Sequence, residues 1–138
     1  MLVGLGHVDL ACRDLEKSLV FYADVFGELG LQPPHCVLGE RGETISYLRF
    51  PQPGSGSLGL RQALEEQPFE LYAPGLHHVA ITVEQKADVD RAYENAVAAG
   101  AEILHAPRFC GICSFRTGPV ETSLVAATVV CALQEGRG

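Results

Sequence analysis

The chain lacks several features that would place it in a particular class of protein. No run of about 18 apolar residues occurs in its 138 residues, so the sequence predicts no membrane-spanning helix. Its first residues, MLVGLGH, hold neither a basic leader nor a long apolar block, so we expect no secretion signal. Basic residues are few, with 10 Lys and Arg against 17 Asp and Glu and a net charge of −7. Because nonspecific nucleic-acid binding depends on clustered Lys and Arg, we do not expect nucleic acid as a partner. We expect no membrane partner either, because the apolar run needed to span a bilayer is missing.

An even set of cysteines is also missing. The chain has 5, so at least one stays unpaired in any disulfide scheme within the chain, and we expect a cytoplasmic protein. Cys110 and Cys113 have the C-x-x-C spacing of redox motifs and of half a zinc site. However, only Cys131 follows them, and the next residues are typical of strand and turn rather than of a helix. The favoured interpretation is therefore ordinary, partly buried thiols at Cys12, Cys36, Cys110, Cys113 and Cys131.

The most informative feature that is present is an internal repeat. Hydrophobic residues make up 47% of the chain, which is enough for the core of a single globular domain over residues 1–138. Residues 4–10, GLGHVDL, align with residues 75–81, GLHHVAI, at an offset of 71, and the same offset pairs Tyr22 with Tyr93. This offset is close to half the chain length, so we predict two tandem modules, about 1–66 and 74–134.

The first module has the periodicity of a β-α-β-β-β unit. Residues 7–11 are typical of a short strand, and Asp14 is a good N-cap for a helix that ends at Gly27 and Gly30. Apolar residues at helical spacing predict its buried face: Leu15, Leu19, Tyr22 and Phe26. Three further strands are expected at 31–38, 45–50 and 58–63, with turns at 39–42 and 51–56.

The second module repeats this order. We expect a strand over 78–83, a helix that ends at Gly100, and strands over 101–104, 110–115 and 122–133. The apolar face of that helix would carry Val89, Tyr93, Ala96 and Val97. The predicted fold is therefore α+β, with two tandem βαβββ modules forming a curved mixed sheet around a cleft.

Histidines at equivalent positions of the repeat are candidates for a metal site. Neighbouring residues of a strand point to opposite faces, so His77 and His78 cannot both enter the cleft, and the offset selects His78 as the partner of His7. Two imidazoles from symmetry-related strands would make half of a divalent-metal site. His35 and His105 lie beside turn prolines and are interpreted as ordinary surface residues.

These segments resemble a known family. Residues 6–10, GHVDL, and 14–27, DLEKSLVFYADVFG, look like the opening strand and helix of the vicinal oxygen chelate superfamily, which includes glyoxalase I, bleomycin- and fosfomycin-resistance proteins and extradiol dioxygenases. Residues 75–83, GLHHVAITV, and 87–104, ADVDRAYENAVAAGAEIL, are similar to its second module, so the resemblance covers about residues 4–109. It implies paired βαβββ modules and, in metal-dependent members, a divalent ion held by a His from the first strand of each module, here His7 and His78.

The last part of the chain departs from that family. Its second module usually ends in a tight turn and a final strand that carries a glutamate ligand, whereas residues 122–133 hold no Asp or Glu. Glu121 precedes this strand and is our candidate for the catalytic carboxylate and third metal ligand, with Gln62 as a neutral alternative. One hypothesis is that the reading frame is altered near Cys110.

Three functions remain open at this point. The first is a metal-dependent enzyme, a lyase or isomerase of the glyoxalase type or a dioxygenase, which uses Fe, Mn, Zn or Ni to bind a small oxygen-rich substrate. The second is a metal-free drug-binding protein of the bleomycin-resistance type, whose acidic cleft sequesters a cationic molecule. The third is a thiol-based redox or zinc module. A long apolar strand near the end of the chain also leads us to expect a homodimer.

Overall fold

The fold is described by a computed structural model that covers residues 1–65, 67, 70, 72–103 and 106–107. The chain divides into two compact units, Met1–Gln67 and Pro68–Gly138, and each is described by itself. Residues 110–115 and 122–133, for which strands are predicted, lie outside the described residues, as do Leu104 and His105.

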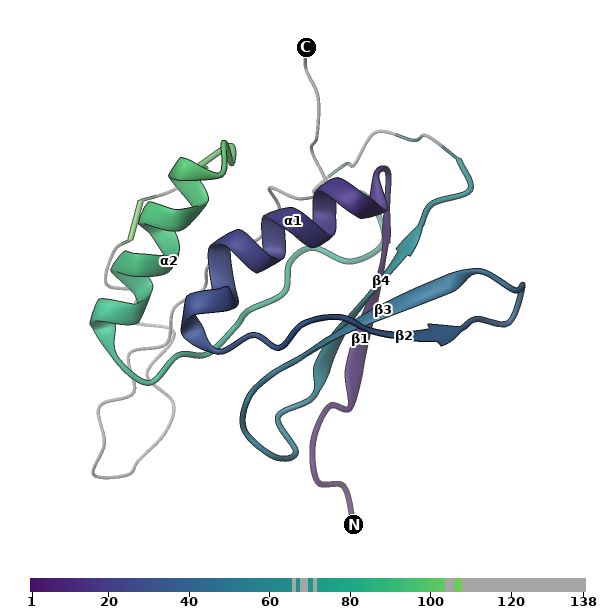
Figure 1. Cartoon of the computed structure of the whole chain (residues 1–138), viewed down its shortest axis with the longest axis horizontal. Coiled ribbons are helices and arrows are strands. Elements are labelled where there is room, and N and C mark those ends of the chain that lie inside the picture. Colours follow the sequence, from purple (N-terminus) through teal and green to yellow (C-terminus); the bar gives the residue numbers. More distant parts are fainter. Residues whose placement is uncertain (66, 68–69, 71, 104–105, 108–138) are drawn as a thin grey trace. The chain divides into compact units, whose positions relative to one another are not determined.

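The first unit is a four-stranded sheet covered by one helix (Figure 1). Its elements are β1 (His7–Cys12), α1 (Leu15–Phe26), the short 3₁₀ helix η1 (Gly27–Leu29), β2 (His35–Leu38), β3 (Thr44–Arg49) and β4 (Ser57–Gln62). The strand order is β1-β4-β3-β2, with β1 parallel to β4 and the other pairs antiparallel. The predicted β-α-β-β-β order of this module and the α+β class are confirmed.

Helix α1 begins and ends where the sequence predicts. The side chain of Asp14 accepts a hydrogen bond from the backbone N–H of Lys17 at 3.1 Å, and this bond lowers the pKa of Asp14. After η1 the chain leaves through Gly30, whose φ of +101° is in the left-handed region that favours glycine. The buried face is shifted from the predicted one, because Ser18, Tyr22, Val25 and Phe26 are buried whereas Leu15 and Leu19 are only half-buried.

The alternation of side chains gives the sheet two different faces. One face supplies the core, which includes Leu10, Cys12, Leu48, Leu58 and Leu60, all at most 5% exposed. Helix α1 packs on this face through β4. The opposite face, which we call the open face, carries the intervening residues of the same strands, among them His7, Asp9, Tyr47, Gly59 and Arg61.

Strand β2 is shorter than predicted. The sequence suggests a strand from residue 31, but β2 begins at His35. Pro33 and Pro34 precede it, and proline has no backbone N–H to donate to a neighbouring strand. The predicted β-strand therefore starts only after the second proline.

The described part of the second unit consists of α2 (Lys86–Ala98) and the segments on either side of it. The backbone N–H of Gln85 donates to the Asp88 carboxylate at 3.2 Å and caps the helix. Val89 and Ala92 are buried, whereas Val97 is 51% exposed and lies outside the predicted buried face. The helix ends at Ala98 and Ala99 caps it, just before the predicted stop at Gly100.

Two strands predicted for this unit do not form among the described residues. Residues 77–83 and 101–103 pair with no strand in the part of the chain that the structure describes. An extended segment becomes a strand only where a neighbouring strand pairs with its backbone groups, and the predicted partners lie in the part of the chain that is not described. The predictions of strands over 78–83 and 101–104 therefore stay predictions.

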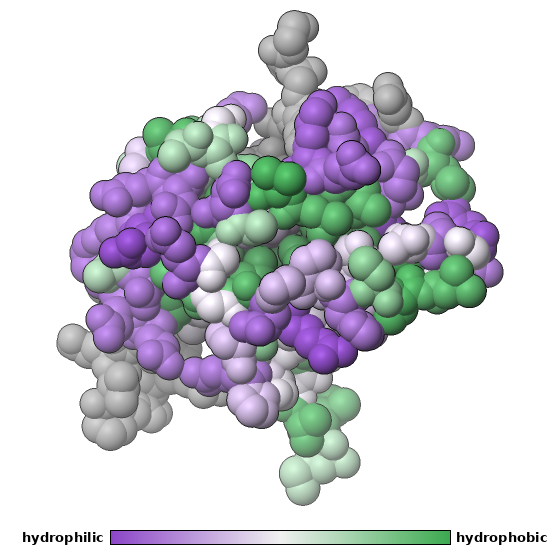
Figure 2. Space-filling model, in the orientation of Figure 1, coloured by the Kyte–Doolittle hydropathy of each residue, from purple (hydrophilic) through white to green (hydrophobic). Residues whose placement is uncertain are grey.

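The surface includes one conspicuous apolar segment. Met1, Leu2, Val3 and Leu5 precede β1 and are 72% to 118% exposed. The start of the chain lies at the bottom of Figure 1, and the surface there is hydrophobic in Figure 2. Neither helix of the described residues has the length and apolar character needed to cross a bilayer.

Candidate functional site

His7 opens β1 on the open face of the first sheet. Its side chain is 57% exposed, and its ring meets the ring of Tyr47 edge-on, with centroids 5.4 Å apart. Nε2 lies 3.9 Å from Asp9 Oδ1, which is beyond hydrogen-bond distance. Neither ring nitrogen is therefore hydrogen-bonded within the described part of the chain, so the imidazole can still accept a ligand.

Beside His7, Asp9 lies at the centre of a polar network. The guanidinium of Arg61 donates to Asp9 Oδ2 through Nη2, and the hydroxyl of Tyr47 donates to the same oxygen at 3.3 Å. Burial raises the pKa of Tyr47, and the negative charge of Asp9 raises it further. Tyr47 is therefore a neutral hydrogen-bond donor at physiological pH.

Arg61 extends this network to the turn between β2 and β3. Its Nη1 donates to Glu43 Oε1 at 3.0 Å and to both oxygens of Glu40 at 3.0 and 3.1 Å. The hydrogen bonds to Asp9 and Glu40 raise the pKa of Arg61. The pKa values of Glu40 and Glu43 are lowered, first by a hydrogen bond from each residue's own backbone N–H, and Arg61 contributes to both. Three carboxylates thus surround one guanidinium.

Glycine at position 59 makes room for the network. Gly59 pairs with Asp9 of β1 on one side and with Tyr47 of β3 on the other. The three residues form one row across the sheet, with the glycine between Asp9 and Tyr47. A Cβ atom at this position would overlap Asp9 Oδ1 and would lie 2.7 Å from Tyr47 Cε1. The absence of a side chain therefore lets the Tyr47 hydroxyl cross β4 and reach Asp9.

His77 and His78 lie differently from the prediction. Their Nδ1 atoms are 2.7 Å apart, so one ring donates a hydrogen bond to the other, and both side chains are exposed. His77 also meets Tyr72 edge-on at 5.3 Å between ring centroids. This contact turns the two rings toward each other, whereas the sequence predicts that they point to opposite faces.

Gln62 has a structural position. Its Oε1 accepts from the backbone N–H of Leu15 at 3.0 Å, and its Nε2 donates to the carbonyl oxygen of Arg13 at 2.6 Å. Both ends of the amide thus hold the start of α1. The neutral alternative for a metal ligand is therefore a helix anchor in this structure.

The other candidates are placed as follows. His35 is exposed on the edge strand β2. Cys12 is buried and Cys36 exposed, both as free thiols. Glu121, Cys110, Cys113 and Cys131 lie outside the described residues. Among the residues that are described, no three His, Cys, Asp or Glu side chains form a group suited to a metal ion.

The sequence alone does not predict the network of Asp9, Tyr47 and Arg61 on the open face, although part of the pattern is present in it. His7 and Asp9 are two residues apart on one strand, and Gly59 and Arg61 are two apart on another, so each pair shares a face. What the sequence did not supply was the register between the strands. Only that register brings Asp9, Tyr47 and Arg61 together.

The first unit has the fold of a βαβββ module. Comparisons with known proteins identify the family in which this module occurs. The model of the Glyoxalase/Bleomycin resistance protein/Dioxygenase superfamily matches residues 4–109. The chain belongs to this superfamily, as the resemblance of its sequence predicts.

Solved structures support the same fold. A glyoxylase/bleomycin resistance protein/dioxygenase domain from Frankia sp. EAN1pec is 28% identical, with a TM-score of 0.60 over 74% of this chain and 77% of that one. A mutant of the fosfomycin resistance protein FosX from Listeria monocytogenes, complexed with Mn(II) and 1S,2S-dihydroxypropylphosphonic acid, is 20% identical, with a TM-score of 0.55 over 78% and 79% of the two chains. No curated protein matches the chain.

Proposed function

We propose that this chain is a metal-dependent enzyme that acts on a small oxygen-rich substrate. His7 and His78 would hold a divalent cation, and Glu121 would supply the carboxylate. The observation that carries the proposal is the position of His7 at the start of β1, where its exposed imidazole has no hydrogen bond to any residue that the structure describes. Family membership supports it, because His7 is the position that the resemblance assigns to the first ligand.

The donor set fits such an ion. Neither ring nitrogen of His7 is hydrogen-bonded among the described residues. The contact between His77 and His78 engages only Nδ1 of each ring, so Nε2 of His78 is not used by that contact. Two imidazoles and a carboxylate suit Fe(II), and they are also ligands of Mn, Zn or Ni. FosX was solved with Mn(II), which makes manganese a useful first test for this chain. A bound divalent ion would act as a Lewis acid toward adjacent substrate oxygens.

The residues around His7 have their own tasks in this proposal. The edge-on contact with Tyr47 restricts rotation of the imidazole. Arg61 and Tyr47 both bind Asp9 Oδ2 and thereby hold the carboxylate beside His7 Nε2. This arrangement keeps a carboxylate 3.9 Å from His7 Nε2, close to the place where a cation would bind.

A second candidate function is metal-free binding of a cationic small molecule, as in bleomycin resistance. The acidic character of the network favours it, since Asp9, Glu40 and Glu43 outnumber the cation Arg61 that they surround. This function needs neither His7 nor His78. A thiol-based site at Cys110 and Cys113 is a third candidate, and a homodimer in the cytoplasm stays a prediction.

Thermal unfolding with added metal tests the proposal. Protein treated with EDTA should gain thermal stability when Mn²⁺, Fe²⁺, Zn²⁺ or Ni²⁺ is added, because a ligand that binds only the folded state stabilises it. His7→Ala and His78→Ala should each abolish that gain, whereas His35→Ala, a change at an exposed histidine, should retain it. A gain that survives both His variants but is lost in Cys110→Ser would favour the thiol site. Stabilisation by bleomycin without any metal effect would favour the drug-binding function.

A further inference from the structure

Arg49 differs from the other basic residues of the described chain. Every other Lys and Arg side chain that the structure describes takes part in an ion pair, a hydrogen bond or another contact, including Lys17 with Asp14, Arg41 with Glu43 and Lys86 with Asp90. Among the described residues, the exposed guanidinium of Arg49 alone has no such contact. In a chain with a net charge of −7, carboxylates that could neutralise a cation are plentiful, so this unpaired cation stands out.

The sheet register places Arg49 in a row with two further polar side chains. Arg49 pairs with Ser57 across β3 and β4, and Ser57 pairs with His7 across β4 and β1. Paired residues of neighbouring strands project from the same face. A guanidinium, a hydroxyl and an imidazole therefore line one end of the open face. Because strands lie about 4.8 Å apart, the backbones of Arg49 and His7 are about 10 Å apart.

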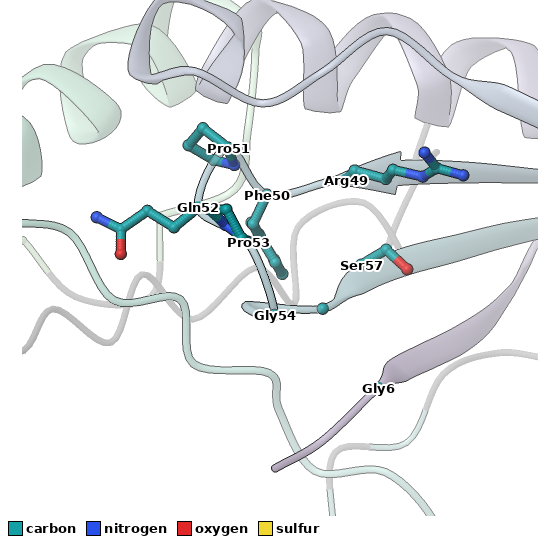
Figure 3. A pocket seen from close by; sticks show the side chains of 9 residues that line it. Gly6, Arg49, Phe50, Pro51, Gln52, Pro53, Gly54 and Ser57 are labelled. Carbon is teal, nitrogen blue, oxygen red and sulfur yellow. The ribbon is translucent and has the colours of Figure 1, made fainter. Parts of the chain in front are cut away.

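A hollow lies beside this row. The cavity has a volume of about 320 Å³ and is lined by Gly6, by Arg49 and Ser57, and by the turn that carries Pro51, Gln52 and Pro53. Figure 3 shows the side chains of Arg49 and Ser57 extending from neighbouring strands toward the same side of the picture. Because both residues line the hollow, a small ligand group held there could contact both side chains.

The backbone fixes the position of this hollow. Gly56 has a φ of +87°, and a Cβ atom at this residue would lie 2.8 Å from the carbonyl oxygen of Gly6. Only glycine permits this approach, which brings the Ser57 N–H to within 3.1 Å of the same oxygen. Ser57 is thus held next to the strand that begins with His7.

We infer that Arg49 and Ser57 bind the oxyanion group of a small molecule, a carboxylate, phosphate or phosphonate. The guanidinium fork donates two parallel hydrogen bonds to such a group, and the Ser57 hydroxyl donates a third. The inference rests on the proposed function in one respect. It assumes that the oxyanion is one end of the substrate and that the oxygen atoms at the other end lie near His7. It narrows the substrate class to anionic molecules that span about 10 Å or less.

Anion binding to the full-length chain after removal of metal with EDTA tests the inference. The probes are methylphosphonate, inorganic phosphate and acetate, and the readout is the amide chemical shifts of Gly6, Gly54 and Gly56 in nuclear magnetic resonance spectra. We expect saturable shifts for at least one probe. Arg49→Gln should weaken its binding at least about tenfold, because a charge-assisted hydrogen bond is lost, and Ser57→Ala should weaken it less. Arg49→Lys keeps the positive charge but lacks the forked pair of N–H donors, so its affinity for the probe should lie between those of the parent protein and Arg49→Gln.

The matched control is Arg41→Gln, which removes the same charge from another exposed arginine and should leave binding unchanged. The inference is wrong if no probe gives saturable shifts, or if Arg41→Gln weakens binding as much as Arg49→Gln. Because the test uses metal-free protein, its outcome is independent of whether His7 and His78 bind a metal. Retention of the amide spectrum in Arg49→Lys or Arg49→Gln shows that the variant is folded.

Discussion

The hydroxyl of Tyr47 donates a hydrogen bond to Asp9 across an intervening strand, with 3.3 Å between the two oxygens. The two residues are 38 positions apart in the sequence, and Gly59 lies between them in the sheet. The open face therefore depends on strand register, and substitutions at this row should report on its structure.

Gly59→Ala should destabilise the protein by about 1–3 kcal/mol, the usual cost of forcing an extra group into a packed site. The new methyl group would overlap Asp9 and crowd Tyr47, and both would have to move. Urea unfolding of the two proteins measures the loss in free energy.

The control for this substitution is Gly27→Ala, at a glycine with φ of −59° and open space where the new methyl would lie. It should be neutral or slightly stabilising. Equal stability of Gly59→Ala and the parent protein would contradict the close packing of Asp9, Gly59 and Tyr47.

Acid should weaken the first unit through Glu40 and Glu43. Their pKa values in the folded protein lie below the ordinary value of 4.5, so the unfolded chain takes up protons first as the pH falls. Their contribution to stability is present above pH 4.5 and is lost as the pH falls through their folded-state pKa values. The free energy of unfolding, measured in urea between pH 7 and pH 3, should therefore decline below about pH 4.5.

The double variant Glu40→Gln, Glu43→Gln should show a shallower decline, because neither amide titrates. Asp24→Asn is the control, since Asp24 is exposed on α1 and forms no ion pair within the described residues. An identical pH dependence in the parent protein and the double variant would show that the pKa values of Glu40 and Glu43 are not lowered in the folded protein.

Ser18 is fully buried on α1, and its hydroxyl oxygen has no hydrogen-bond partner among the described residues. Ser18→Ala removes a buried polar atom whose desolvation is not compensated, so stability should stay unchanged or rise by up to about 1 kcal/mol. Thermal and urea unfolding measure the effect. A loss greater than about 1 kcal/mol would show that the hydroxyl makes a hydrogen bond in the folded protein.

The reading-frame hypothesis also makes a definite prediction. The family model matches residues up to 109, and the hypothesis places the change near Cys110. Translating the coding DNA after codon 109 in the other two frames should then give a tight turn followed by a strand with a glutamate. If neither frame gives both features, the hypothesis fails and Glu121 remains the candidate carboxylate.

Much of the first module could be predicted because its signals are local. Asp14 as N-cap, Gly30 as helix terminator and the alternation along β1 and β4 depend only on near neighbours in the chain. The sequence predicts that this strand begins at residue 31, but β2 begins at His35 because the two prolines before it cannot donate backbone hydrogen bonds to a neighbouring strand.

The network on the open face could not be predicted, because it depends on contacts between distant segments. Arg61 meets Asp9 only because β4 inserts between β1 and β3, and the sequence alone does not give that order. The contact between the rings of His77 and His78 could not be predicted for a related reason. Alternation holds only in a paired strand, and residues 77–83 form none among the described residues.

The most direct test of the central claim is the metal content of protein purified without added metal. Elemental analysis should find about one divalent ion per chain in the parent protein and in His35→Ala, and almost none in His7→Ala or His78→Ala. Circular dichroism spectra like that of the parent protein would show that both variants remain folded. A parent protein without bound metal that also takes up none of Mn²⁺, Fe²⁺, Zn²⁺ or Ni²⁺, or metal retained in both His variants, would contradict the claim.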